Sequence, residues 1–129
     1  MHCGRLARRI LVVDDEPAIR FALREYLAGH DWAVDCAGDR GEASALLAQR
    51  SYDVVVADLR LHVARDDDGL EVLSEVRSRH PGTHTVLLTA YGSPGVELEA
   101  RRRGADVVLH KPQSLREIER IVDALTARS

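Results

Sequence analysis

Cysteine, aromatic residues and long apolar runs are scarce in this chain of 129 residues. Two cysteines, Cys3 and Cys36, are too few for a disulfide framework and lack the C-x-x-C spacing of a metal or redox site, so we expect reduced thiols. No apolar run approaches the ~20 residues that a membrane span needs. The first arginines are not followed by the apolar stretch of a signal peptide. We therefore expect a soluble, cytoplasmic protein with no membrane contact.

A large excess of positive charge is also missing. The formal net charge is −3, whereas a nucleic-acid-binding domain normally carries a basic patch or stripe, so we expect no direct contact with nucleic acid. The hydrophobic content of 45% is ordinary for a globular protein, and the length suits one domain. We place this domain at residues 9–129, after an N-terminal extension of residues 1–8.

Short apolar runs alternate five times with longer amphipathic segments. The runs are residues 10–13, 33–34, 54–57, 86–88 and 107–109. Three of them are continuously apolar and rich in β-branched residues, which is typical of strands buried on both faces of a parallel sheet. The amphipathic segments predict helices at residues 17–28, 40–49, 70–77, 93–103 and 115–127. The fourth helix is the least regular, because Pro94 and Gly95 lie near its start.

Five βα units in succession predict the α/β class, with a doubly wound, five-stranded parallel sheet flanked by five helices. Right-handed crossovers leave few topologies, and the flavodoxin-like strand order 2-1-3-4-5 is a common one. Ligands of such sheets bind beyond the carboxyl ends of the strands. The polar residues at those ends are Asp14, Asp15, Asp58, Thr89 and Lys111.

This residue set matches phosphoryl transfer to an aspartate. Three carboxylates held together repel one another unless a cation joins them, and hard oxygen ligands suit Mg²⁺. A carboxylate can act as a nucleophile and form an aspartyl-phosphate, while a metal ion, a lysine and a hydroxyl bind the phosphoryl oxygens. Each residue alone is a weak signal, since an aspartate at a strand end is commonly a helix cap and a lone lysine a solvated charge.

Five segments carry a more specific signal. They are ILVVDDEPAIR (residues 10–20), YDVVVADLRL (52–61), DGLEVL (68–73), VLLTAYG (86–92) and GADVVLHKP (104–112). In this order and spacing they resemble the receiver domains of two-component response regulators, and the resemblance covers the chain from Arg9 onward. It implies that Asp58 is the phospho-acceptor. It also implies Mg²⁺ as cofactor, with four protein ligands: Asp14, Asp15, Asp58 and the backbone carbonyl of Arg60.

The resemblance implies that Thr89 donates its hydroxyl to the phosphoryl group and that Lys111 pairs with a phosphoryl oxygen. It also predicts a cis peptide bond between Lys111 and Pro112. The implied function is a phosphorylation-dependent switch, which catalyses only its own phosphorylation and dephosphorylation. A sensor histidine kinase or phosphotransfer protein supplies the phosphoryl group, and the bound charge changes the surface offered to an unknown downstream protein or fused effector domain.

The loop after the acceptor, residues 58–69, departs from the family pattern. It is about three residues longer than usual and has His62 where proline is common. The acidic run at residues 66–68 predicts a cap for the third helix, with a longer, mobile flap as the alternative.

Strand five departs too, since Val108 stands where the family has an aromatic switch residue. This departure leaves open how phosphorylation is relayed, with Tyr91 as one substitute. Arg60 and Tyr91 occupy positions that control water access in the family, and we expect their bulk to slow dephosphorylation.

Two other functions compete with the switch. One is a pseudo-receiver that binds a protein partner constitutively. The other is a nucleotide-binding or flavin-binding protein, which is disfavoured because Asp-Asp-Glu stands where a glycine-rich phosphate loop would be. Three successive arginines at residues 101–103 are interpreted as a solvated helix end that complements the helix dipole, or alternatively as a patch for an acidic partner.

Overall fold

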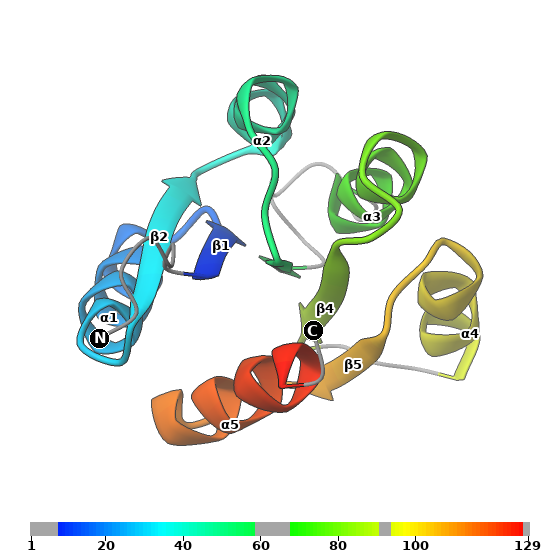
Figure 1. Ribbon diagram of the computed structural model, residues 1–129. Helices are drawn as coiled ribbons and strands as arrows, with labels where there is room; N and C mark the ends of the chain where they lie inside the picture. The colour runs from blue at the N-terminus through cyan, green and yellow to red at the C-terminus, as the bar shows by residue number, and fades with distance from the viewer. Residues whose placement is uncertain (1–7, 59–67, 91–93, 128–129) are drawn as a thin grey trace.

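The computed structural model describes residues 8–58, 68–90 and 94–127. Within these ranges strands and helices alternate as predicted (Figure 1). The strands are β1 (Arg8–Val13), β2 (Trp32–Ala37), β3 (Val54–Asp58), β4 (His84–Thr89) and β5 (Val107–His110). The helices are α1 (Pro17–Ala28), α2 (Arg40–Gln49), α3 (Asp68–Arg79), α4 (Pro94–Arg102) and α5 (Leu115–Thr126). None of the helices described is long and apolar enough to cross a membrane.

The strands form one parallel sheet in the order β2-β1-β3-β4-β5, which confirms the predicted doubly wound topology. In the register of the sheet, Val12 of β1 lies opposite Cys36 of β2 and Val56 of β3. The chain moves outward from β1 to β2, and then from β3 outward in the other direction. The carboxyl ends of β1 and β3 therefore flank the switch point at which such sheets bind ligands.

Successive residues of β1 are buried on opposite faces of the sheet, which explains the unbroken apolar sequence of this strand. Ile10 and Val12 pack on the face that carries α1 and α5, for example with Ile118. Leu11 and Val13 pack on the other face with side chains of α2 and α3. Figure 1 shows the corresponding layers, with α1 and α5 on one side of the sheet and α2, α3 and α4 on the other.

Side-chain caps set the start of two helices. Asp39 before α2 and Ser114 before α5 each accept a hydrogen bond from the backbone N–H three residues later, at 2.8 and 3.0 Å. The helix α3 begins at Asp68, two residues before the predicted start. The prediction began at Leu70 because the apolar pattern begins there, whereas the first turn of a helix accepts polar side chains.

The end of α4 differs from the prediction at residues 101–103. The helix ends at Arg102, one residue before the predicted end, and the side chain of Arg103 is only partly exposed, at 30%. Its guanidinium lies 2.8 Å from a carboxylate oxygen of Glu99 and 3.5 Å from one of Glu71. Packing of α4 beside α3 brings an acidic side chain of α3 within reach of Arg103, whereas Arg101 and Arg102 at the end of α4 are exposed, as the interpretation of a solvated helix end requires.

Candidate functional site

Three carboxyl groups meet at the carboxyl edge of the sheet. Asp14 and Asp15 directly follow β1, and Asp58 is the last residue of β3. One carboxylate oxygen from each lies within 4.8 Å of the others. Asp14 and Asp58 are buried, with 2% and 8% of their surface exposed, whereas Asp15 is exposed. The sequence prediction that these residues converge is confirmed.

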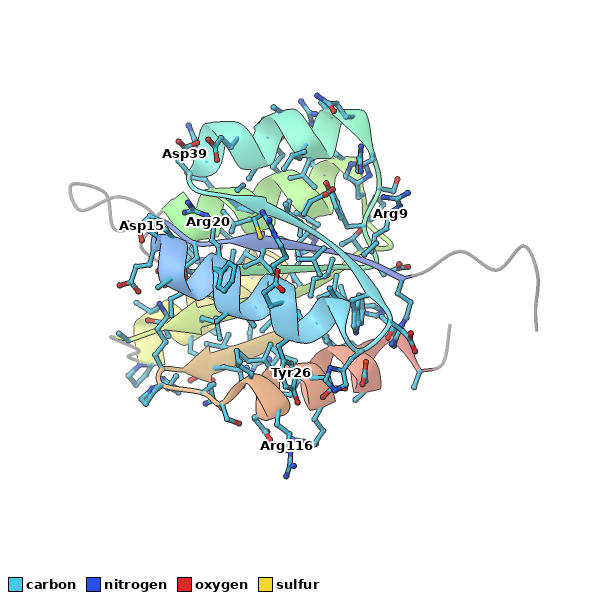
Figure 2. All side chains as sticks on the ribbon, turned by 90° about the vertical axis from the view of Figure 1, so that its left-hand side faces the viewer. Arg9, Asp15, Arg20, Tyr26, Asp39 and Arg116 are labelled. Atoms are coloured by element: carbon cyan, nitrogen blue, oxygen red, sulfur yellow. The ribbon has the colours of Figure 1, made fainter. Side chains whose placement is uncertain are left out.

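The turn after β1 is fixed by hydrogen bonds on each side of Asp14. Its backbone N–H donates to the carbonyl of Ala37 at 3.0 Å, which extends the pairing of β1 with β2. Its Oδ1 accepts from the N–H of Glu16 at 2.9 Å, and its carbonyl accepts from Arg20 Nη1 at 2.7 Å. Figure 2 shows Arg20 on α1 near the turn that carries Asp15. The acidic turn is therefore held in one conformation from both sides.

Lys111 reaches two of the three carboxylates. Its Nζ lies 3.2 Å from Oδ2 of Asp58 and 3.6 Å from Oδ2 of Asp14. Its backbone N–H donates to the carbonyl of Thr89 at 2.8 Å, and the peptide bond to Pro112 is cis, as predicted. Thr89 itself is fully buried at the end of β4, one residue beyond the partner of Asp58 in the sheet register.

Burial opposes ionisation of the carboxyl groups. Desolvation is the largest cause that raises the pKa of Asp58 from 3.8 to about 6, while the Lys111 ammonium opposes the rise and Asp14 adds to it. Burial also raises the pKa of Asp14, against the hydrogen bond from the N–H of Glu16 and the charge of Lys111. Burial alone would lower the pKa of Lys111, but the charges of Asp14 and Asp58 raise it, so the ammonium stays charged.

The donor set fits a hard divalent cation. Oδ2 of Asp14 is buried and accepts no hydrogen bond from any residue that the structure describes, and the ammonium of Lys111 stands 3.6 Å away. A buried carboxylate oxygen without a donor is unfavourable. Carboxylate oxygens from three residues are ligands that suit Mg²⁺. The predicted fourth ligand, the backbone carbonyl of Arg60, lies outside the described residues, as do His62 and Tyr91.

The sequence model of the response regulator receiver domain matches residues 10–123. The chain belongs to this receiver domain family. It is similar to the transcriptional regulatory protein ResD of Bacillus subtilis, with 36% identity over 121 residues that cover 94% of this chain and 49% of ResD. The receiver domain therefore spans about half the length of ResD.

Solved receiver structures share the fold. A CheY-like receiver domain protein from Methanospirillum hungatei is 26% identical, with a TM-score of 0.83 over 95% of this chain and 99% of that chain. The response regulator TrrA of Thermotoga maritima, solved in complex with Mg²⁺-BeF, is 34% identical, with a TM-score of 0.78 over 92% of this chain and 98% of that chain. The sequence-based assignment to receiver domains is confirmed.

Val108 of this receiver domain is a core residue. It is 8% exposed and packs with Leu73, Leu87 and Ala100 between the sheet and the helices α3 and α4. Its neighbours in β5, Val107 and Leu109, pack on the opposite face with α1 and α5. Val108 therefore places a short side chain facing α4 at the position where the family has an aromatic residue.

Arg20 is a residue of this receiver domain that sequence reasoning missed. Its guanidinium supports the acidic turn through the carbonyl of Asp14 and also fills the space beside Gly38, where a Cβ would come within 3.0 Å of Nη1. In a sequence, an arginine one turn into a helix looks the same whether its side chain supports a neighbouring turn or points into solvent. Only the packing of α1 against the turns after β1 and β2 reveals it.

Proposed function

We propose that this receiver domain is a phosphorylation-dependent switch in which Asp58 accepts a phosphoryl group. The observation that carries the proposal is the buried carboxylate of Asp58, which lies beside the carboxyl groups of Asp14 and Asp15 and 3.2 Å from the ammonium of Lys111. With a pKa of about 6, the group is mostly ionised at neutral pH, so it can act as a nucleophile. The charge of Lys111 is aimed at the place where phosphoryl oxygens would lie.

In the proposed transfer, a carboxylate oxygen of Asp58 attacks the phosphorus atom of a phosphohistidine. The new O–P bond forms as the P–N bond to the donor's imidazole breaks. Lys111 neutralises charge on one phosphoryl oxygen, and Thr89 donates its hydroxyl to another. Mg²⁺, held by Asp14, Asp15, Asp58 and the carbonyl of Arg60, supplies further charge neutralisation when bound.

The proposed partners follow from the family. A sensor histidine kinase or a phosphotransfer protein is the donor, and an unknown downstream protein or a fused effector domain receives the signal. We assign the receiver to residues 9–129 and treat residues 1–8 as an extension, although its last residue, Arg8, already pairs with Trp32 as the first residue of β1. The domain acts in the cytoplasm, makes no direct contact with nucleic acid, and catalyses only its own phosphorylation and dephosphorylation. Slow dephosphorylation remains a prediction that rests on Arg60 and Tyr91.

The pseudo-receiver alternative is not supported. A constitutive binding module has no use for two buried carboxyl groups with raised pKa values, because both lower the stability of the fold at neutral pH. Lys111 also places its ammonium 3.6 Å from Asp14 and 3.2 Å from Asp58, where it would neutralise a phosphoryl oxygen on Asp58.

The proposal is tested by incubating the protein with Mg²⁺ and acetyl phosphate and measuring its intact mass. The wild type should gain one phosphoryl group, and Asp58→Ala should gain none. Asp53→Ala is the matched control, because it removes a carboxylate just before the same strand, at the end away from the site, and should leave the gain intact. No gain in the wild type, or an undiminished gain in Asp58→Ala, would refute the assignment.

A further inference from the structure

Arg20 of α1 holds the peptide group that joins Asp14 to Asp15. Its Nη1 donates to the carbonyl of Asp14 at 2.7 Å, and this carbonyl lies in the same planar peptide group as the N–H of Asp15. Rotation of that peptide group would turn both carboxyl side chains. One hydrogen bond from a charged donor therefore bears on two of the three carboxyl groups of the site.

The carboxylate of Asp14 takes its orientation from the same turn. Its Oδ1 accepts from the N–H of Glu16 at 2.9 Å. Its Oδ2 lies 3.6 Å from Lys111 and accepts no hydrogen bond within the described part of the chain. A change in the turn would break the bond at Oδ1 and redirect Oδ2. The oxygen that is left for a cation is thus aimed by the backbone that Arg20 holds.

The start of α1 has no side-chain cap. Glu16 precedes the helix and its side chain makes no capping hydrogen bond, whereas Asp39 and Ser114 cap α2 and α5. The carbonyl of Glu16 accepts from the backbone N–H of Arg20 at 3.1 Å. Arg20 therefore joins the first turn of α1 to the acidic turn through its backbone and its side chain, where a cap would otherwise fix the geometry.

Gly38, in the turn after β2, leaves the space for the guanidinium. A Cβ at this position would lie 3.0 Å from Nη1 and 3.4 Å from Cζ of Arg20. The backbone of Gly38 is not left-handed, so this space and not φ favours glycine here. The turn is itself held, because the N–H of Gly38 donates to Oε1 of Glu42 at 2.6 Å. Figure 2 shows Arg20 beside the turns that carry Asp15 and Asp39.

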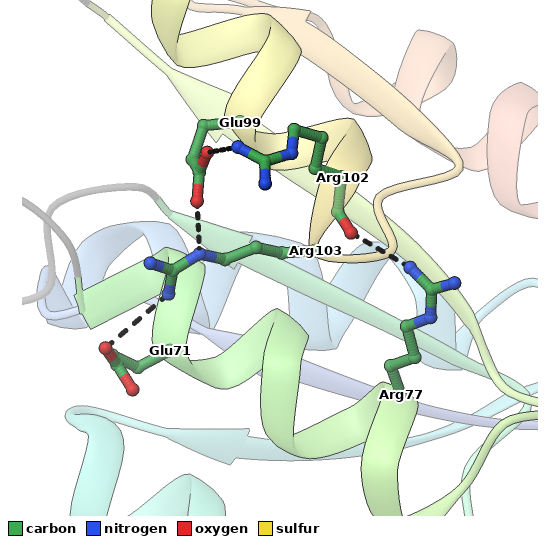
Figure 3. Close-up of polar contacts among 5 residues, drawn as sticks. All are labelled: Glu71, Arg77, Glu99, Arg102 and Arg103. Atoms are coloured by element: carbon green, nitrogen blue, oxygen red, sulfur yellow. Dashed lines mark hydrogen bonds and ion pairs between the residues drawn. The ribbon is translucent and has the colours of Figure 1, made fainter.

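Arg77 and Gly104 are an internal contrast. Arg77 Nη1 donates to the carbonyl of Arg102 at 2.9 Å (Figure 3), and its Cδ lies 3.1 Å from where a Cβ of Gly104 would stand. Arg77 lines the same hollow as His84, the first residue of β4, so it lies at the edge of the sheet opposite to the site. The same arrangement of arginine, carbonyl and glycine thus occurs far from the carboxyl groups.

We propose that Arg20 is a positioning residue of the Mg²⁺ site, and that its bond to the carbonyl of Asp14, in the space left by Gly38, fixes the turn that aims Asp14 and Asp15. The inference rests on the proposed function and adds a residue to its metal site. Mg²⁺ demands nearly octahedral geometry, whereas Ca²⁺ accepts flexible geometry. A turn that Arg20 no longer holds should therefore lose more affinity for Mg²⁺ than for Ca²⁺.

The charge and the position of Arg20 act on metal affinity in opposite directions. A guanidinium beside the acidic turn repels a divalent cation, so removal of the charge alone would raise the affinity for Mg²⁺. Removal of the support should lower it. Gly38→Ala separates the two effects, because the new Cβ displaces the guanidinium and leaves the net charge unchanged.

The experiment follows the backbone amide signals of the protein by NMR while Mg²⁺ or Ca²⁺ is added. Arg20→Gln and Gly38→Ala should each weaken Mg²⁺ binding about threefold to tenfold, and Ca²⁺ binding by less. The double variant should bind no more weakly than Arg20→Gln, since both changes remove one contact. Two controls should stay within about twofold of the wild type: Arg24→Gln, an exposed arginine of α1, and Arg77→Gln.

Amide exchange in the metal-free protein tests the support directly. The N–H of Glu16, which donates to Asp14, should exchange with solvent about twofold to tenfold faster in Arg20→Gln than in the wild type. Arg24→Gln should leave this rate unchanged. An unchanged rate in Arg20→Gln would show that the turn does not depend on the guanidinium and would overturn the proposal.

The metal titrations can overturn the proposal in three further ways. An unchanged or raised Mg²⁺ affinity in Arg20→Gln contradicts the positioning role. An equal loss of Mg²⁺ and Ca²⁺ affinity contradicts it too, because a general change of charge or fold acts on both ions. A loss in Arg20→Gln without one in Gly38→Ala removes the role of the space at Gly38. A wild type that binds no Mg²⁺ overturns the proposed metal site instead, while the metal-free exchange of Glu16 still decides whether Arg20 holds the turn.

Discussion

Replacing Asp58 by asparagine is expected to stabilise the metal-free protein at neutral pH. The rise of its pKa from 3.8 to about 6 means that the folded state disfavours the ionised group by about 3 kcal/mol, at 1.36 kcal/mol per pH unit. The folded state binds the proton more tightly than the unfolded state. The penalty therefore grows as the pH rises from about 4 to about 6 and is complete above that window. Because asparagine keeps the shape without the charge, the free energy of unfolding should rise by about 1–3 kcal/mol at pH ~7.5.

Urea unfolding in the presence of a chelator measures this effect at pH ~7.5 and at pH ~4. The advantage of Asp58→Asn should disappear at the lower pH, where the wild-type carboxyl group is protonated in the folded state. Glu25→Gln is the control, because it removes one negative charge from an exposed position on α1 and should change the stability by less than about 0.5 kcal/mol. Added Mg²⁺ should stabilise the wild type more than Asp58→Asn, which has lost a ligand.

A variant less stable than the wild type at pH ~7.5 would refute the reasoning, because attraction to Lys111 would then outweigh desolvation. An advantage that persists unchanged at pH ~4 would also contradict it, since packing rather than charge would be its cause. The control separates a local effect from a general change in net charge.

Two further predictions concern the scaffold. Gly104→Ala should lower the free energy of unfolding by about 1–2 kcal/mol, because φ is 112° and the new Cβ would lie 3.1 Å from Cδ of Arg77. Thermal unfolding measures this, and a loss no larger than that of Gly82→Ala, where a Cβ meets nothing within 4 Å, would count against it. Ser114→Ala should cost about 1 kcal/mol by removing the cap of α5, whereas Ser114→Asp should retain most of the stability in the same assay. Equal losses in both would contradict the capping role.

The core strands and the site could be predicted because they depend on local patterns. A strand buried on both faces must be apolar throughout, as residues 54–57 of β3 are, and parallel strands bring their carboxyl ends to one edge. The residues at the carboxyl ends of the strands are therefore predicted to lie together, and Asp14, Asp58 and Lys111 follow from this rule without any knowledge of distances. The strand β2 was harder, since it is an edge strand of six residues of which only two were predicted. Asp35, one of its half-buried residues, interrupts the apolar run.

Contacts between helices could not be predicted in the same way. Glu71 and Arg103 are 32 residues apart, and each alone has the appearance of an ordinary surface charge. Their pairing depends on how α4 lies against α3, which no local pattern contains. The support of Asp14 by Arg20 is similar, because it depends on the close packing of α1 with the turn after β1.

The features that make Asp58 suited to phosphorylation are the same ones that make it unfavourable for the fold. Burial raises its pKa, and a carboxylate with a higher pKa is more basic and so a better nucleophile, while a value of about 6 still leaves about nine-tenths of the groups ionised at pH 7. The fold tolerates the arrangement because Lys111 keeps its charge and because hydrogen bonds hold the acidic turn at Asp14. Substitutions at Asp58 that raise stability must therefore remove the chemistry, which is the usual relation between a strained functional site and its scaffold.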